Sequence, residues 1–526
     1  MLRQMRRDNP RFRGCWPQVV FCHGHALGAG HVICIHFGSG HEKYMLYKLI
    51  AQRRSPNEIS TGVGHNKSAS LLEKGATIKI VIILALGLLG HLTGALAQSR
   101  HSASSRFPTY EGLVMCGYQG WFRAEGDGSG EGWSHYSNRG FLAANDVHPD
   151  FWPDVSEYEK TYPSSLTNKD GSTAYVFSSW DESTTDLHFR WMQQYGIDGV
   201  FVQRFFSPLR TRRGREKSRV VLQHALAASQ KYGRAIAVMY DLSGLRENGE
   251  DCSAIIQDWM ELVDELKITS RGTNQTYLFH RGKPLVAIWG LGFPDRPYNI
   301  RDIGIEKVMD FLKNDPKYGG CSIMLGVPTY FRDLDIDTNP DPYLHTLIKS
   351  ADVVMPWMVQ RFTPLVHQFD VNRYEAQIAG DLAWCAERHV DYVPCVSPGF
   401  SWHNMHYHPG EENDDIYPLN QIPRQKGRFY WNEISSALHA KAKMLYVAMF
   451  DEMDEGTAIF KCSNTPPGGV ALCDYEGLPT DHYLWLTGQA GKMLRHEMPF
   501  SAQIPRRALI ASPTHDLDRR TAMENK

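Results

Sequence analysis

Short apolar runs alternate with longer segments of helical period from residue 110 onward. The apolar runs are nearly continuous and rich in Val, Ile, Tyr and Phe, which is typical of parallel strands covered on both faces. Eight of them predict strands, at Val114–Trp121, Gly199–Arg204, Ala235–Tyr240, Pro284–Trp289, Ser322–Val327, Val353–Met358, Tyr392–Val396 and Met444–Phe450. Eight further segments predict helices, at Thr184–Tyr195, Ser218–Tyr232, Ser253–Leu266, Gly304–Leu312, Pro342–Lys349, Arg373–His389, Tyr430–Lys443 and Asp481–Leu494. This alternation predicts an α/β fold, a closed (β/α)8 or TIM barrel that spans residues 110–495 as a single catalytic domain.

One long segment interrupts the repeat. Residues 123–180 form a Gly/Ser-rich, aromatic insertion after the first predicted strand. Because the loops that follow the strands build the active face of such a barrel, we expect the insertion to wall the cleft. The charged tail at 506–526 has no periodicity and is expected to be disordered.

An apolar run lies upstream of the barrel at residues 78–97. It has a charged start, an apolar middle and the small-residue end Ala95-Leu96-Ala97, as a secretory signal cleaved before Gln98 would. Because such a signal belongs at an N-terminus, we interpret residues 1–77 as a leader from a start site set too early. The protein would then be secreted or periplasmic. The alternative is a cytoplasmic tail followed by a membrane anchor at 78–97, the one case in which a membrane partner is expected.

Composition indicates a large globular protein. Of the 526 residues, 42% are hydrophobic and 11% aromatic, so the chain can bury a large core and is not disordered. Lys and Arg number 56 against 58 Asp and Glu, which leaves no excess positive charge to hold nucleic acid. We expect a monomer without a nucleic-acid partner. If the chain is exported, Cys462 and Cys473, which flank a Pro/Gly-rich loop, are expected to form a disulfide.

The residues at the predicted strand ends are unusually aromatic and polar. In a barrel these ends meet at one face, so we expect their side chains to line a common site. Trp and Tyr offer flat apolar faces with polar rims, which suit the faces and hydroxyl edges of sugar rings. The candidates for binding a carbohydrate are Tyr118, Trp121, Arg204, Tyr240, Asp241, Trp289, Trp357, Trp402, His403 and Asp451.

The eighth strand ends in the acidic stretch Asp451-Glu452-Met453-Asp454-Glu455, followed by Gly456 and Thr457. Such crowding raises the pKa of at least one carboxyl group, which can then donate a proton while an ionised neighbour accepts one. Cleavage of a glycosidic bond requires this division of labour. We therefore expect Glu452 and Glu455 to be catalytic, with Asp451 and Asp454 supporting them by hydrogen bonds.

Two other interpretations of this acidic stretch are a solvated loop and a Ca²⁺ or Mg²⁺ site. The spacing lacks the regular ligand ladder of an EF-hand, and no Gly-rich nucleotide-binding loop appears elsewhere. His403, His406 and His408 suggest a zinc cluster but have no acid at a defined spacing. We therefore expect neither a metal nor a cofactor.

The acidic stretch resembles the Asn-Glu-Trp-x-Glu-Gly-Thr motif of glycoside hydrolase family 99, the endo-acting α-mannosidases and mannanases. It is less similar to the Asn-Asp-Tyr-Gly-Glu motif of family 71 α-1,3-glucanases, and residues 110–495 resemble the "71/99-like" group. The resemblance implies that Glu452 deprotonates the sugar 2-hydroxyl and that Glu455 is the general acid/base. It also implies retention of configuration through an epoxide-like intermediate, without a protein nucleophile.

The chain departs from the family 99 motif at three places. Asp451 stands where the family has Asn, Met453 where it has Trp, and Tyr240-Asp241 where it has a strand end bearing His and Glu. The pair of glutamates is retained, so the resemblance favours a secreted glycoside hydrolase acting on a poly- or oligosaccharide. The alternative is a barrel that binds glycan without cleaving it.

Overall fold

The computed structural model describes residues 101–507 except 103, 138, 248, 271–274, 363–370 and 407–416. All of these lie in one compact unit, Ile82–Lys526. The leader at 1–77, the apolar run at 78–97 and the tail beyond residue 507 are outside the described residues. Within the described part of the chain, no helix is both long and apolar enough to span a membrane.

Eight strand positions form a ring of parallel strands, as the sequence predicts. The strands are β1 (Val114–Tyr118), β4 (Gly199–Phe205), β5 (Ala235–Asp241), β7 (Lys283–Trp289), β8 (Ser322–Pro328), β9 (Val353–Trp357), β10 (Asp391–Tyr392) with β11 (Cys395–Val396), and β12 (Leu445–Val447). The seventh position is split: β10 pairs with β9, and β11 pairs with β12. Since β12 in turn pairs with β1, the ring is closed.

The break between β10 and β11 falls at Pro394, which has no N–H to donate to a ladder. Backbone bonds nevertheless continue on both sides of it. The Val393 N–H donates to the Val354 carbonyl at 3.0 Å, and the Pro394 carbonyl accepts the Tyr446 N–H at 3.1 Å. The split therefore changes partners without opening the barrel.

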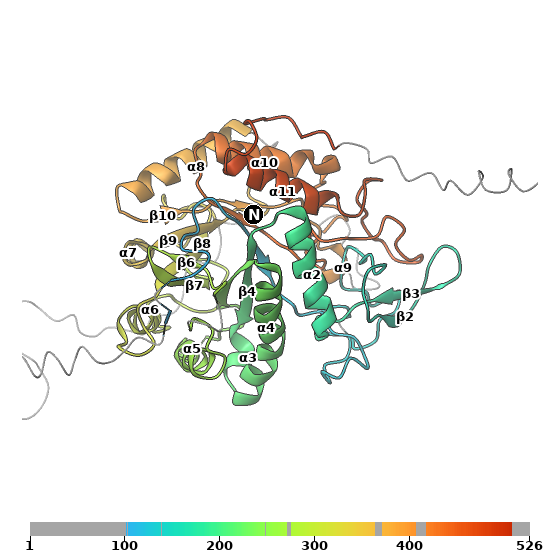
Figure 1. Ribbon diagram of the computed structural model, residues 1–526, viewed down its shortest axis with the longest axis horizontal. Coiled ribbons are helices and arrows are strands. Elements are labelled where there is room, and N and C mark those ends of the chain that lie inside the picture. The colour runs from blue at the N-terminus through green and yellow to red at the C-terminus, as the bar shows by residue number, and fades with distance from the viewer. Residues whose placement is uncertain are drawn as a thin grey trace, which may run out of the picture. The chain divides into compact units, whose positions relative to one another are not determined.

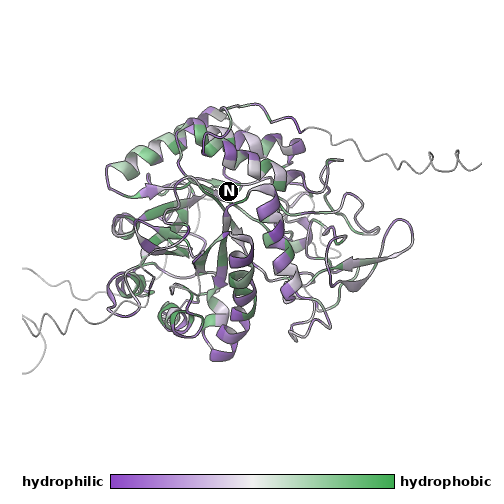
Figure 2. Ribbon diagram, in the orientation of Figure 1, coloured by the Kyte–Doolittle hydropathy of each residue, from purple (hydrophilic) through white to green (hydrophobic). Residues whose placement is uncertain are grey.

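Helices surround the ring and follow the strands in the predicted order (Figure 1). They are α2 (Glu182–Tyr195), α4 (Arg212–Tyr232), α5 (Ala254–Asp264), α6 (Ile305–Asn314), α7 (Tyr343–Ser350), α8 (Val371–Ala386), α10 (Arg428–His439) and α11 (His482–Leu494), with the short α3 (Phe206–Leu209), α9 (His403–His406) and 3-10 turn η1 (Gln425–Gly427). Figure 2 shows hydrophobic strands inside and helices of mixed polarity outside. This is the layering that a barrel of amphipathic helices requires.

Helix α4 shows why the sequence sets these limits. Its first turn is capped by the Thr211 side chain, which accepts the Gly214 N–H at 3.0 Å. It ends at Gly233, whose φ of 61° lies in the left-handed region that glycine adopts without strain. The predicted start at Ser218 is too late because the first turn, from Arg212, is polar and has no apolar period.

The insertion after β1 carries an antiparallel hairpin, β2 (Tyr162–Thr167) and β3 (Thr173–Val176). A second small hairpin, which the sequence pattern does not indicate, pairs β6 (Phe279–His280) with β7. The insertion also reaches the loop after β12 through isolated bridges from Phe151 to Cys473 and from Pro153 to Cys462. The predicted disulfide between these cysteines is wrong for this structure, since each thiol is free and buried beside the insertion.

Candidate active site

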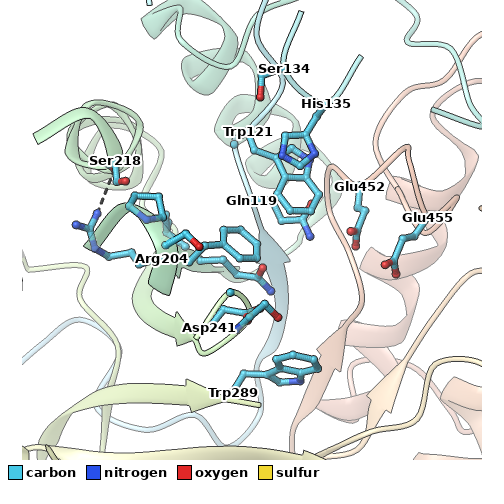
Figure 3. Close-up of a pocket in the computed structure, with 18 of the residues that line it drawn as sticks. Gln119, Trp121, Ser134, His135, Arg204, Ser218, Asp241, Trp289, Glu452 and Glu455 are labelled. Carbon is cyan, nitrogen blue, oxygen red and sulfur yellow. Dashed lines mark hydrogen bonds between the residues drawn. The ribbon is translucent and has the colours of Figure 1, made fainter. Parts of the chain in front are cut away.

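A cavity of about 770 Å³ lies at the carboxyl ends of the barrel strands (Figure 3). Its volume is in the range of roughly 300–1,000 Å³ that small-ligand sites occupy. Eight predicted site residues contribute to its lining: Trp121, Arg204, Asp241, Trp289, Trp357, Trp402, Glu452 and Glu455. The structure therefore brings together the predicted acids and most of the predicted aromatic residues.

Aromatic rings form two platforms on the cavity wall. Trp121 is stacked between His135, at 3.8 Å between ring centroids, and Phe205, at 5.0 Å. Trp289 meets Trp357 edge to face at 5.4 Å. Among the described residues, the indole N–H groups of Trp121, Trp289 and Trp402 have no hydrogen-bond partner. The flat aromatic faces suit a ligand with apolar ring faces and hydroxyl edges.

The turn after β12 presents Glu452 and Glu455 to the cavity. The Glu452 carbonyl accepts the N–H groups of Thr457 at 3.1 Å and Ala458 at 2.7 Å, which closes the turn. The Glu455 carbonyl accepts the Ser401 N–H at 3.0 Å and ties the turn to the loop after β11. In Figure 3 the two carboxylates point the same way, with Asp241 and Trp289 on the opposite side.

Gly456 allows the chain to leave the turn. Its φ is +63°, and a Cβ at this position would lie 2.8 Å from the Ser401 nitrogen. Only glycine meets both demands without strain. The buried Arg424 supports the same turn, because its guanidinium donates to the carbonyls of Gly456 at 2.8 Å and Ala458 at 2.7 Å. Hydrogen bonds to its backbone therefore hold the segment that carries the two glutamates in place.

The two glutamates share an environment that favours their neutral forms. Burial raises the pKa of Glu452 well above its usual value, and the negative charges of Glu455 and Asp454 raise it further. Burial also raises the pKa of Glu455 to about 7, where the charge of Asp454 adds to the rise and the Arg296 cation opposes it. The pair therefore keeps a proton up to near-neutral pH, so that one member can donate while the other accepts.

The two aspartates of the stretch have other partners than expected. The Asp451 carboxylate is buried and accepts the N–H groups of Gln119 at 2.9 Å and Gly120 at 2.8 Å. Asp454 contacts the His135 ring at 3.0 Å. The expectation that these aspartates form hydrogen bonds to the glutamates is therefore wrong. Asp451 instead binds the end of β1, and Asp454 binds the insertion.

Three predicted binding residues point away from the cavity centre. The Tyr118 hydroxyl is hydrogen-bonded to His188 Nδ1 of α2 at 3.0 Å, and the Tyr240 hydroxyl donates to Asp258 of α5 at 3.0 Å. Arg204 is placed at the cavity wall, but its Nε donates to Asp258 at 2.7 Å and Figure 3 shows its guanidinium turned toward Ser218. The physical reason is that alternate side chains of a strand face opposite sides of the sheet.

His403 also lies outside the residues that line the cavity. Its backbone N–H donates to Asp150 at 2.7 Å, and its ring contacts the Tyr417 carbonyl at 2.8 Å. In the structure it anchors the loop after β11 to the insertion, while its neighbour Trp402 faces the cavity.

Sequence reasoning missed several residues that line the cavity. Gln119 and Phe205 follow Tyr118 and Arg204 directly, so the two-residue period of the strands could have indicated them. Arg296 lies in the loop after β7 with its guanidinium carbon 5.2 Å from the Trp289 ring centroid. His135 comes from the insertion, where no period or motif marks it.

Comparison with solved structures gives a relative by fold. The GH99 endo-alpha-mannosidase from Bacteroides thetaiotaomicron is 15% identical, with a TM-score of 0.50, over 74% of this chain and 99% of that chain. Its complex with bis-tris-propane gives the same values. No family model matches the sequence, and the comparison with curated proteins found no match. At this identity the likeness is one of fold, and the chain has a (β/α)8 barrel similar to that of this endo-alpha-mannosidase.

Proposed function

We propose that this protein is a glycoside hydrolase that cleaves bonds between sugars of an oligo- or polysaccharide. The observation that carries the proposal is the placement of Glu452 and Glu455. Both stand at the carboxyl end of the last barrel strand and both line one cavity with Trp121, Trp289 and Trp357. Catalytic groups of barrel enzymes stand at this face, and a carboxyl pair beside aromatic platforms suits glycosidic cleavage.

The proposed mechanism follows the resemblance to family 99. Glu452 accepts the proton of the sugar 2-hydroxyl, whose oxygen forms a bond to the anomeric carbon while the bond to the leaving oxygen breaks. Glu455 donates a proton to that leaving oxygen. Water, deprotonated by Glu455, then opens the epoxide at the anomeric carbon, and Glu452 returns its proton to the 2-oxygen. The two displacements give net retention of configuration.

Substrate and location extend the proposal. The fold relative is an endo-alpha-mannosidase, so α-mannan is the first substrate to examine. Because Asp451 and Met453 replace the Asn and Trp of the family 99 motif beside the two glutamates, other polysaccharides should be tested as well. We propose further that residues 78–97 direct export. Sequencing the N-terminus of the mature protein tests this, with Gln98 as the expected first residue.

The activity test uses reducing-sugar release from α-mannan, α-glucan, xylan and arabinan. The parent is expected to release sugar from at least one of them, and Glu455→Gln to lower the rate on it by about 10²–10⁴-fold, the usual contribution of general acid–base catalysis. Glu247→Gln, in the loop after β5 and outside the cavity lining, is the matched control and should retain the parent rate. Glycan binding without turnover in the parent would instead favour the non-catalytic barrel.

A further inference from the structure

Three potential metal ligands converge beside the cavity from distant parts of the chain. His135 and His148 belong to the insertion after β1, and Asp454 lies between the two glutamates. One ligand atom from each lies within 4.8 Å of the other two. The His135 Nδ1 and the Asp454 Oδ2 are already in contact at 3.0 Å.

Polar atoms of this cluster are buried and unpaired. The side chain of Asp454 is 1% exposed, and among the described residues its Oδ1 has no hydrogen-bond partner. The Nδ1 of His148 is likewise buried without a partner in that part of the chain. A buried carboxylate oxygen without a hydrogen-bond partner is energetically costly, and a bound cation at this position would compensate that cost.

We propose that His135, His148 and Asp454 bind a divalent transition-metal ion of the Zn²⁺ class. Two imidazoles and one carboxylate are a common ligand set for such ions. Zinc bonds of about 2.0–2.2 Å in a tetrahedron place ligand atoms roughly 3.4 Å apart. The contact between His135 and Asp454 needs to widen by a few tenths of an ångström, and the farthest ligand needs to move inward by about 1.4 Å at most. Rotation of an imidazole ring can supply this movement.

The free coordination position of the ion would face the cavity. His135 is 31% exposed at its side chain and lines the cavity, whereas Asp454 is 1% exposed and, like His148, is not among the lining residues. Water or a hydroxyl group of a bound molecule can therefore reach the metal. The inference does not depend on the proposed glycosidase activity, because it rests on the three ligands alone.

Titration of the metal-free full-length protein with ZnCl₂, followed by calorimetry, tests the proposal. The full chain carries other His and Cys residues, among them Cys22 and His23, so the informative quantity is the number of sites lost in each variant. The parent is expected to bind one more equivalent of zinc than either His148→Gln or His135→Gln. If a variant keeps this site, its zinc affinity should be about 100-fold weaker than that of the parent. Zinc should also raise the thermal midpoint of the parent more than that of either variant.

His439→Gln is the matched control. His439 lies at the end of α10, outside the proposed cluster; its side chain is 59% exposed and pairs with Glu375 of α8 at 2.7 Å. It should keep the parent's zinc stoichiometry. Circular dichroism identifies a variant that fails to fold, and two separate histidine variants keep the test informative. An anomalous zinc peak among the three side chains in a crystal supports the proposal. Equal stoichiometry and affinity in the parent and both cluster variants would overturn it and leave a hydrogen-bonded His–Asp contact.

Discussion

Asp451 joins the last strand of the barrel to the first through one buried carboxylate. Its two oxygens accept the N–H groups of Gln119 and Gly120 at 2.9 and 2.8 Å. In Asp451→Asn an amide NH₂ faces one of these donors, so that one N–H loses its acceptor. We expect the free energy of unfolding to fall by about 1–3 kcal/mol, measured by urea denaturation.

A surface aspartate provides the comparison for Asp451. Asp302 is exposed, and Asp302→Asn should change the free energy of unfolding by no more than about 0.5 kcal/mol. Equal stability of the two variants would contradict the role given to Asp451.

Single residues also show where sequence reasoning reached its limit. Glu452 and Glu455 could be found because four acids crowd at the end of an apolar strand, and the structure places both at the cavity. The sequence suggests Tyr118 and Tyr240 only because they stand at strand ends, and their side chains face α2 and α5 instead. Which alternate side chains of a strand face the cavity and which face the helices depends on where that strand begins to pair, and the sequence does not give this position.

At the scale of elements, the turn after β12 depends on Gly456. Any other residue there would hold a left-handed φ, at about 1–2 kcal/mol, and would also press on Ser401. We expect Gly456→Ala to lose more than about 2 kcal/mol of stability and to lower turnover, since the same turn carries Glu455.

The variant Gly171→Ala separates the cost of a left-handed φ from the cost of the contact with Ser401. Gly171 lies between β2 and β3 with a φ of +85°, and a Cβ there would meet nothing within 4 Å. Gly171→Ala should therefore show only the cost of the backbone conformation and full turnover. Equal losses of stability in the two glycine variants, by thermal denaturation, would refute the close approach to Ser401.

The packing of α2 on β1 introduces a pH dependence. His188 of α2 lies between the hydroxyls of Tyr118 at 3.0 Å and Tyr158 at 2.7 Å, and burial lowers its pKa to about 3. In the unfolded chain an imidazole protonates near pH 6.5. Between these values the unfolded state binds more protons, so the free energy of unfolding should fall as the pH drops from about 6.5 toward 3.

The variant His188→Gln isolates this effect, because glutamine keeps hydrogen-bonding groups but does not titrate. Denaturation curves between pH 7 and pH 4 should give a shallower loss of stability for the variant than for the parent. Parallel profiles would show that His188 does not contribute to the acid sensitivity of the fold.

At the scale of the whole molecule, the barrel could be predicted because each strand–helix unit carries its own local period. The long-range contacts that complete the cavity could not. Asp150, in the insertion, accepts the N–H groups of His403 and Asn404 at 2.7 Å each, although these residues lie more than 250 positions away in the chain. No local pattern encodes such a pairing, and for the same reason the sequence does not indicate that His135 and His148 lie near Asp454.

The proposed roles of Glu452 and Glu455 are tested most directly by a crystal structure of Glu455→Gln with an oligosaccharide that the parent protein cleaves. We expect a sugar stacked in the cavity, with its glycosidic oxygen within about 3 Å of the residue 455 side chain. The 2-hydroxyl of the neighbouring sugar should lie equally close to Glu452. A glycan bound elsewhere on the molecule, or one whose glycosidic oxygens all lie beyond reach of both side chains, would contradict these roles.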